Sequence, residues 1–214
     1  ADAERGFSFL LDGPLDMRMD TSAPTETAAQ IVNQWSEFDL RKLLQVYGEE
    51  RFAPQIARAI VKRRESQPFV NTLALAELVE QTIPRRFHKP NFHPATLTFQ
   101  ALRIEVNQEL AQLEALLEHV PRRLRSQGCF AVISFHSLED RLVKQAFRDW
   151  EDPCTCPKDL PRCVCGKVPV GKSLQRKPIV AADEEVRGNP RSRSARLRVF
   201  VRNETPWEAL EGES

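Results

Sequence analysis

The chain has 214 residues, which is enough for one sizeable hydrophobic core or two small ones. Its 41% hydrophobic and 29% charged residues are ordinary for a soluble globular protein, and its net charge of +1 does not by itself point to a nucleic-acid partner. No signal peptide and no apolar run long enough to span a bilayer is visible, so we expect no membrane partner and a cytoplasmic location. Five cysteines in such a chain indicate a reducing compartment rather than a disulfide framework.

The first part of the chain predicts a loop followed by helices. Residues 1–22 contain two glycines and one proline and are expected to form a loop. From about Thr25 the pattern becomes helical, and a helix is expected between the N-cap Ser36 and the stop signal Gly48. Its buried stripe is predicted to consist of Leu40, Leu43, Leu44 and Tyr47.

Three further helices are predicted. One places Phe52, Ile56 and Ile60 on a single face and ends before Pro68, and another is capped by Thr72 and stops before Pro84. A basic and aromatic loop follows over residues 85–94 and leads into a single long helix. The apolar residues of that helix recur at intervals of three and four: Phe99, Leu102, Val106, Leu110, Leu113 and Leu117.

The pattern then changes to that of an α/β protein. The continuous apolar run of residues 129–135 suits a strand buried on both faces, as in a parallel sheet, with Cys129 in the core. Ser137 is expected to cap the next helix. The last strand alternates Leu197, Val199 and Val201 with Arg196, Arg198 and Arg202, which predicts one wet face. Two strands that no hairpin joins are not a stable sheet, so we expect partner strands from outside the chain.

Five stretches carry a resemblance to a known family. They are ERGFSF (Glu4–Phe9), DGPLDMRMD (Asp12–Asp20), HPATLTFQALRIEVNQEL (His93–Leu110), ISFHSLEDRLVK (Ile133–Lys144) and NPRSRSARLRV (Asn189–Val199). Because these stretches occur in this order, the chain resembles the small-subunit (16S) rRNA cytosine-N(4) methyltransferases, which modify the exocyclic amine of a cytosine at the ribosomal decoding site. The likeness extends over nearly the whole chain.

The resemblance implies a fold, a cofactor and a partner. The fold would be α/β, namely the second half of a Rossmann-like S-adenosylmethionine-dependent methyltransferase domain with an all-helical insertion. Residues 1–22 would be a methyltransferase-domain loop, residues 23–106 the helical insertion that recognises substrate, and residues 107–214 the C-terminal half of the α/β domain, with a Cys-rich loop at 153–166. The partner would be 16S rRNA in the small ribosomal subunit.

The resemblance also implies that the cofactor pocket is missing. Roughly the first hundred residues of family members hold S-adenosylmethionine, and this chain begins just after them. No G-x-G-x-x-G or comparable cofactor loop occurs in the sequence. We therefore expect the chain alone to lack methyltransferase activity.

Two clusters are candidates for catalysis. The first is Asp12, Asp16, Arg18 and Asp20 beside Gly13-Pro14. It is either a turn held by carboxylate and Asp–Arg hydrogen bonds or a wall of the substrate pocket, where a carboxylate orients the amine and a proton is lost after transfer.

The second catalytic candidate follows the end of the predicted strand at residues 129–135. Ser137 and Asp140 are interpreted as helix caps, whereas capping needs neither His136 nor Glu139, so these two are the site candidates. His136 would contact the base or accept a proton. A lone histidine with a structural role is the alternative.

The RNA-binding candidates are basic residues of the matching stretches. Arg191 and Arg193 lie in a Ser/Arg loop without acids, which suits phosphate contacts, although a solvated loop is the alternative. Arg18, His93 and Arg103 complete the predicted set. Leu97 stands where family members usually have arginine, so any RNA contact made by that position is lost here.

Four cysteines are candidates for a metal site. Cys154, Cys156, Cys163 and Cys165 form C-x-C, six residues, C-x-C, and four soft ligands on a short hairpin can surround a structural zinc ion. Free thiols or incidental redox pairing are the alternatives. A zinc-stabilised, ribosome-associated RNA-binding protein without catalysis is the rival function.

Overall fold

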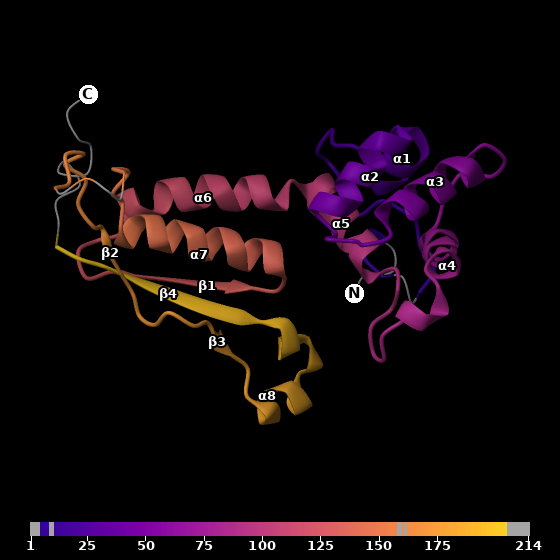
Figure 1. Ribbon diagram of the computed structural model, residues 1–214. Coiled ribbons are helices and arrows are strands. Elements are labelled where there is room, and N and C mark those ends of the chain that lie inside the picture. The colour runs from indigo at the N-terminus through magenta and orange to yellow at the C-terminus, as the bar shows by residue number, and fades with distance from the viewer. Residues whose placement is uncertain (1–4, 9–10, 158–159, 161, 205–214) are drawn as a thin grey trace. The chain divides into compact units, whose positions relative to one another are not determined.

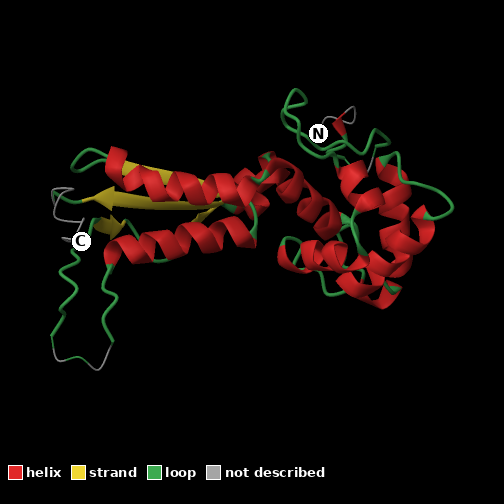
Figure 2. Ribbon diagram, turned by 90° about the horizontal axis from the view of Figure 1, so that it is seen from above, coloured by secondary structure: helices red, strands yellow, loops and turns green. Residues whose placement is uncertain are grey.

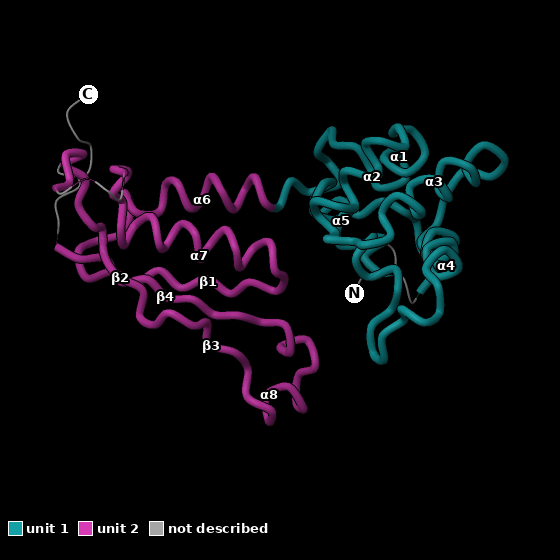
Figure 3. The backbone as a smooth tube through the Cα atoms, viewed as in Figure 1, with its two compact units in different colours: residues 1–109 teal, residues 110–214 magenta. Residues whose placement is uncertain are grey.

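The computed structural model describes the chain except for residues 1–4, 9–10, 158–159, 161 and 205–214. The chain divides into two compact units, residues 1–109 and residues 110–214 (Figure 3). Across the described residues, none of the helices combines the length and the apolar character needed to cross a membrane. The predicted domain boundaries at residues 22 and 106 stay a prediction, since a division into compact units does not test them.

The first unit is helical (Figure 1). Its elements are α1 (Ala28–Gln34), α2 (Glu37–Val46), α3 (Ala53–Arg64), α4 (Thr72–Thr82), the short 3-10 helix η2 (Arg85–Phe87) and α5 (Thr96–Asn107). The Ser36 side chain caps α2 as predicted, by accepting a hydrogen bond from the Asp39 amide. The prediction that Thr72 caps α4 is wrong by one residue: Asn71 is the N-cap, and its side chain accepts from the Ala74 amide.

The core of the first unit is closed. Leu15 and Met17, from the predicted loop, are buried in the same cluster as the inward faces of the helices. Leu40, Leu44, Ile56, Ile60, Leu75 and Leu102 are among its fully buried side chains. The periodic apolar positions of the sequence therefore mark most of this core correctly, whereas Tyr47, predicted in the buried stripe, is half-buried at the C-cap of α2.

The predicted single long helix is in fact two helices. Gln108 has a φ of 51° and is the left-handed C-cap of α5, with its amide bonded to Ile104 and Glu105 carbonyl oxygens. A new helix, α6 (Glu109–Arg123), begins directly afterwards. The apolar spacing continues across this break because each helix keeps an apolar stripe of its own, so periodicity alone does not reveal it.

The second unit is a small antiparallel sheet with helices (Figures 1 and 2). Besides α6 it contains β1 (Cys129–Ser134), α7 (Ser137–Glu151), β2 (Gly171–Ser173), β3 (Ile179–Val180), α8 (Asp183–Gly188), the 3-10 helix η3 (Pro190–Ser194) and β4 (Arg196–Arg202). β4 is central, with β1 on one edge and both β2 and β3 on the other. A side chain at Gly171 would lie 2.2 Å from the Val201 carbonyl oxygen, so only glycine allows β2 to approach β4.

One face of this sheet is covered by helices. Phe130 of β1 lies opposite Phe200 of β4, and both pack against Phe147 and Trp150 of α7. Leu117 of α6 joins the same cluster. In Figure 2, α6 and α7 lie side by side over the strands.

The surroundings of β1 differ from those that the sequence predicts. β1 is not buried on both faces, since its exposure alternates, Ile133 is 59% exposed, and Cys129 is exposed instead of lying in the core. Its partner in the described residues, β4, runs antiparallel rather than parallel. The apolar run therefore predicts the strand correctly but not its surroundings, because neighbours and not composition decide whether a second face is covered.

The polarity of β4 is the reverse of the prediction. Arg196, Arg198 and Arg202 share a face with Phe200, which is the face that packs on α7. The apolar alternation, Leu197, Val199 and Val201, lies on the other face with the exposed side of β1. The short strands β2 and β3 were not predicted, because two or three residues carry no alternating pattern.

Candidate functional site

The turn around Asp16 is held by a two-pronged ion pair. Arg18 donates from Nε to Asp16 Oδ1 at 2.8 Å and from Nη2 to Oδ2 at 2.9 Å. The hydrogen bond from Arg18 lowers the pKa of Asp16, and that from Ser22 lowers the pKa of Asp20. These are the contacts of the structural alternative, and they commit Arg18 to the turn rather than presenting it to a ligand.

Asp12 connects the same segment to α4. Its Oδ2 accepts from Asn71 Nδ2 at 3.1 Å, and its Oδ1 accepts from the Gly13 amide at 3.1 Å. The side chain remains exposed. The roles of Asp12 and Asp16 in a substrate pocket stay a prediction, and the structure gives each a clear part in shaping the loop.

His136 and Glu139 form the N-terminal cap of α7. His136 Nδ1 accepts from the Glu139 amide at 3.4 Å, while Glu139 Oε2 accepts from the amides of Phe135 at 2.8 Å and His136 at 3.3 Å. The statement that capping needs neither residue is therefore wrong, and Ser137 is the first helical residue rather than the cap. The cap fixes the imidazole, which is 7% exposed, at the end of β1.

Asp140, predicted as a cap, instead holds the arginine face of the sheet. Arg198 donates to it from Nε at 2.7 Å and Nη2 at 3.1 Å, and Arg196 donates from Nη1 at 3.1 Å. The Asp140 side chain is 8% exposed, and burial opposes its ionisation. The hydrogen bonds from Arg198 and Arg196 outweigh burial and lower its pKa.

The remaining RNA-binding candidates fall into two groups. Arg103 is bound at both ends of its guanidinium by Glu109, with distances of 2.7 and 2.9 Å, and His93 Nδ1 accepts from the Ala95 amide at the start of α5. Arg191 and Arg193, in contrast, are exposed on η3, and the described part of the chain offers neither an ion-pair partner. The geometry favours the second group for phosphate contacts.

The segment carrying Arg191 and Arg193 is locally rigid. Asn189 Oδ1 accepts from the Arg191 amide at 3.2 Å, and the buried Ser192 donates from its hydroxyl to the Asn189 carbonyl oxygen at 2.8 Å. The inward Ser192 anchors η3, so both neighbouring arginines project outward. An exposed cation pair on an anchored turn suits a polyanion.

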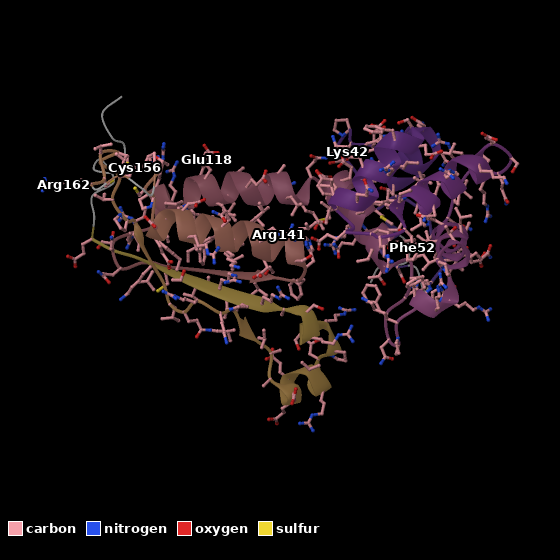
Figure 4. All side chains as sticks on the ribbon, in the orientation of Figure 1. Lys42, Phe52, Glu118, Arg141, Cys156 and Arg162 are labelled. Atoms are coloured by element: carbon pink, nitrogen blue, oxygen red, sulfur yellow. The ribbon has the colours of Figure 1, made fainter. Side chains whose placement is uncertain are left out.

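The four cysteines of the Cys-rich loop converge. Cys163 Sγ lies 3.5 Å from Cys154, 3.9 Å from Cys156 and 3.3 Å from Cys165, and Cys165 lies 3.9 Å from Cys154. Figure 4 shows Cys156 in this loop, near Arg162. Hydrogen bonds from the backbone amides of Lys167 and Thr155 lower the pKa of Cys165 to about 6, whereas the contact with Cys165 raises that of Cys163 to about 12.

Fold and site together define a mixed α/β protein with a helical unit and a thiol-rich loop. A model of the MraW methylase family matches residues 1–203. The chain is 51% identical over 208 residues to the ribosomal RNA small subunit methyltransferase H of Symbiobacterium thermophilum, covering 97% of this chain and 65% of that protein. The proteins of the same name from Geotalea daltonii and Geobacter sulfurreducens are each 55% identical, over 91% and 92% of this chain and 62% and 63% of their own lengths.

The chain therefore belongs to the MraW methylase family. It spans slightly less than two thirds of the length of these relatives.

Proposed function

We propose that this chain is the helical unit and the C-terminal sheet of an rRNA methyltransferase. The reaction would transfer a methyl group from S-adenosylmethionine to the 4-amino group of a decoding-site cytidine in 16S rRNA, in the cytoplasm. Membership of the family, with relatives named for methylation of small-subunit rRNA, is the observation that carries this proposal. It disfavours the rival of a non-catalytic RNA-binding protein.

The sheet of the second unit supports the proposal. In the described residues, β4 is the one strand paired with β1, and the face formed by Cys129, Ala131 and Ile133 is exposed. A Rossmann-like domain covers both faces of its sheet with helices, so this apolar face and the outer edge of β1 would be completed by other parts of the enzyme.

We propose that the methyl donor binds outside the described residues. A Rossmann-like adenosyl site needs a close-approach glycine turn between a strand and a helix, and β1 leads into α7 through Phe135 and His136 instead. The residues present therefore do not fit the cofactor. We place its site in a part of the enzyme beyond this chain.

The chain would supply substrate positioning and a proton acceptor. The strand end at His136 is where ligands of open α/β sheets bind, and the cap holds the imidazole in one orientation. A base contact from His136 would aim the amine, and Nδ1 would take the amine proton only on releasing the Glu139 amide. Arg191 and Arg193 would hold the RNA backbone, and Asp12 and Asp16 would shape the wall of the pocket.

Single-turnover methyl transfer in an N-terminally extended polypeptide tests this function. The extended enzyme should methylate small-subunit rRNA, whereas the present chain should neither bind S-adenosylmethionine in calorimetry nor transfer methyl. In the extended enzyme, His136→Asn keeps a good cap and removes the imidazole, so the rate should fall by about a hundredfold or more while RNA affinity holds. Micromolar cofactor binding by the present chain, or full activity of His136→Asn, would contradict these assignments.

We also propose that Cys154, Cys156, Cys163 and Cys165 bind a structural zinc ion. A tetrahedral site with Zn–S bonds of about 2.3 Å requires sulfur–sulfur distances of about 3.8 Å. The four distances given above run from 3.3 to 3.9 Å, and all four sulfur atoms lie within 4.8 Å of one another. A disulfide would bring two of them to about 2.05 Å.

The position of the zinc site indicates a structural role. The loop connects α7 to β2, and its stem is anchored where the Val170 amide donates to the Trp150 carbonyl oxygen at 2.8 Å and the Asn203 amide donates to the Val170 carbonyl oxygen at 2.9 Å. A metal at the tip would close a segment in which the apolar side chains of Leu160 and Val164 are exposed. The ion would therefore support the loop and take no part in methyl transfer.

Metal analysis of reduced, freshly purified protein tests the zinc site. We expect about one zinc per chain in the unchanged protein and none after replacing the four cysteines with serine. Cys129→Ser is the matched control. Because Cys129 lies on β1 and not in the Cys-rich loop, this variant should bind as much zinc as the unchanged protein. Unchanged protein without zinc, or zinc that survives the fourfold replacement, would remove the site.

A further inference from the structure

A pocket in the helical unit combines aromatic rings with cations. Its volume is about 260 Å³, and its lining includes Arg51, Phe52, Phe87, Lys89, Phe92 and Leu97. These residues come from the turn before α3, from η2, from the loop after it and from the first turn of α5. Phe52 is labelled in Figure 4.

The aromatic part of the pocket consists of the packed pair Phe52 and Phe87 and the separate ring of Phe92. Phe52 and Phe87 pack with centroids 5.1 Å apart and planes tilted by 55°, which leaves both rings half-buried. Phe92 lies on a tight turn in which its amide donates to the Lys89 carbonyl oxygen at 3.3 Å. Half-buried rings that remain accessible are surfaces on which a nucleobase can stack.

The cations gather over these rings. Arg51 and Arg86 each place the guanidinium carbon 5.0 Å from the Phe87 centroid, and Lys89 places its ammonium 6.0 Å from the Phe92 centroid. All three cations are exposed, and the described residues offer them no ion-pair partner. They can therefore reach a phosphate while keeping the rings oriented.

The backbone of the Arg51 turn is built to hold this arrangement. The buried Glu50 lines the pocket and accepts from the Phe52 amide through Oε1 at 2.8 Å, which holds the turn. A side chain on Gly48 would lie 2.6 Å from the Leu44 carbonyl oxygen and 3.0 Å from that of Leu97. Glycine thus lets the turn pack directly against α5. The cations and rings sit on a fixed frame.

We infer that this pocket binds one nucleotide of single-stranded RNA, with the base on the exposed Phe92 ring and the flanking phosphates on Lys89 and on Arg51 and Arg86, whose guanidinium groups Phe87 helps to hold. Aromatic rings interleaved with cations are the pattern that single-stranded nucleic acids require, whereas an apolar peptide needs no cations at the rim. The inference rests on the proposed RNA substrate and adds a second RNA contact, in the helical unit, to that of Arg191 and Arg193.

Leu97 offers a variant that should gain function. It lines the pocket in the first turn of α5, beside the cations. Leu97→Arg adds a guanidinium at the pocket and should tighten RNA binding severalfold, with a steeper salt dependence because one more phosphate is neutralised. A structural role for the pocket predicts no gain.

Fluorescence anisotropy with a labelled single-stranded RNA of about a dozen nucleotides tests the inference on the 214-residue chain. Replacing both Phe87 and Phe92 with leucine keeps apolar bulk and should weaken binding roughly 5- to 150-fold. Phe38→Leu, a change to an exposed ring on α2, is the matched control and should bind like the unchanged chain. Circular dichroism confirms that each variant is folded.

The outcomes separate this inference from the proposed function. If the double leucine variant and Leu97→Arg bind RNA like the unchanged chain, the pocket inference is overturned while the proposed function stands. If the unchanged chain binds no RNA at all, both the pocket and the proposed RNA contacts of this chain fall. A further outcome is that the double variant binds RNA like the unchanged chain but no longer binds an apolar peptide that the unchanged chain binds. The pocket then takes a protein partner, and the inference is wrong.

Discussion

The helical unit and the sheet unit differ in the size of their buried apolar cores. In the helical unit, inward positions such as Leu44, Ile56 and Leu102 are at most 1% exposed. In the sheet unit, Ile133 and Phe135 are 59% and 54% exposed, and a single sheet face is covered by α6 and α7. Burial of apolar surface is the main source of stability. The first unit therefore gains more stability from its own core, and the second unit has apolar surface that is still left to bury.

This difference predicts unequal effects of the same substitution. Ile56→Ala should destabilise the helical unit by about 2–5 kcal/mol, because it leaves a cavity in a closed core. Ile133→Ala should cost at most about 0.5 kcal/mol in the present chain, as for other exposed positions. Urea unfolding followed by hydrogen exchange, which reports each unit separately, measures both. Equal costs would contradict the comparison.

The ion pairs of Asp140 make the covered face of the sheet sensitive to acid. Asp140→Asn leaves Arg198, whose side chain is 10% exposed, without its charge partner and should destabilise the second unit by about 3 kcal/mol. The pKa of Asp140 is lowered on folding, so its stabilisation is complete above the unfolded carboxyl pKa of about 4 and is lost as the pH falls through the lower folded value.

The pH dependence of unfolding checks this assignment. The unchanged chain should lose stability in the sheet unit below about pH 4, and Asp140→Asn should remove much of that loss. Asp16 has a lowered pKa as well, so Asp16→Asn is the matched control that should change acid sensitivity in the helical unit alone. A sheet unit whose acid sensitivity is the same with and without Asp140 would refute the role of the pair.

Arg191 and Arg193 should affect RNA rather than stability. Replacing both with alanine should weaken RNA binding about tenfold for any sequence and reduce the slope of log affinity against log salt by about 1.4, since about 0.7 is lost for each single-strand phosphate contact. Titration at several salt concentrations measures both effects. Replacing the ion-paired Arg103 with alanine should leave the slope unchanged, and an equal change there would contradict the distinction between paired and exposed arginines.

The cysteine loop should have the smallest effect on activity. Replacing Cys154, Cys156, Cys163 and Cys165 with serine in an extended enzyme should leave turnover within about tenfold, since the site supports a loop and not the reacting atoms. Hydrogen exchange should become faster in residues 153–170. A loss of turnover beyond a hundredfold would place the loop in the active site instead.

The sequence predicted the helical unit better than the sheet for a physical reason. The inward face of a helix is determined by spacing within one segment, so Leu40, Leu44 and Ile60 were recognised from local pattern. The break at Gln108 was missed because a left-handed C-cap does not require glycine or leave a mark in apolar spacing.

The sheet depends on partners that are distant in sequence. The arginines of β4 were expected in water because nothing local shows that Asp140 of α7 neutralises them. An acid on the helix after one strand, together with alternating arginines on another, is the signal that would have indicated this pairing.

The candidate site was predicted unevenly for the same reason. The cysteine quartet was visible because its spacing alone defines a ligand set, and the sulfur atoms do converge. The cap formed by His136 and Glu139 was misread, although Glu three residues after the cap position is its usual sign. The aromatic pocket combines Arg51 with Phe87 from separate segments, which no single pattern contains.

Hydrogen exchange of β1 tests most directly whether the sheet unit is an open part of a larger methyltransferase domain. The amides of residues 129–135 would be compared in the present chain and in an extended polypeptide that carries the region of a relative that this chain does not cover. We expect β1 to exchange much faster than α3 and α5 in the present chain, and its protection to rise to their level in the extended protein. Equal protection of β1 in both polypeptides would show that its edge and its apolar face need no further partner, and the sheet unit would then not be an open part of a larger domain.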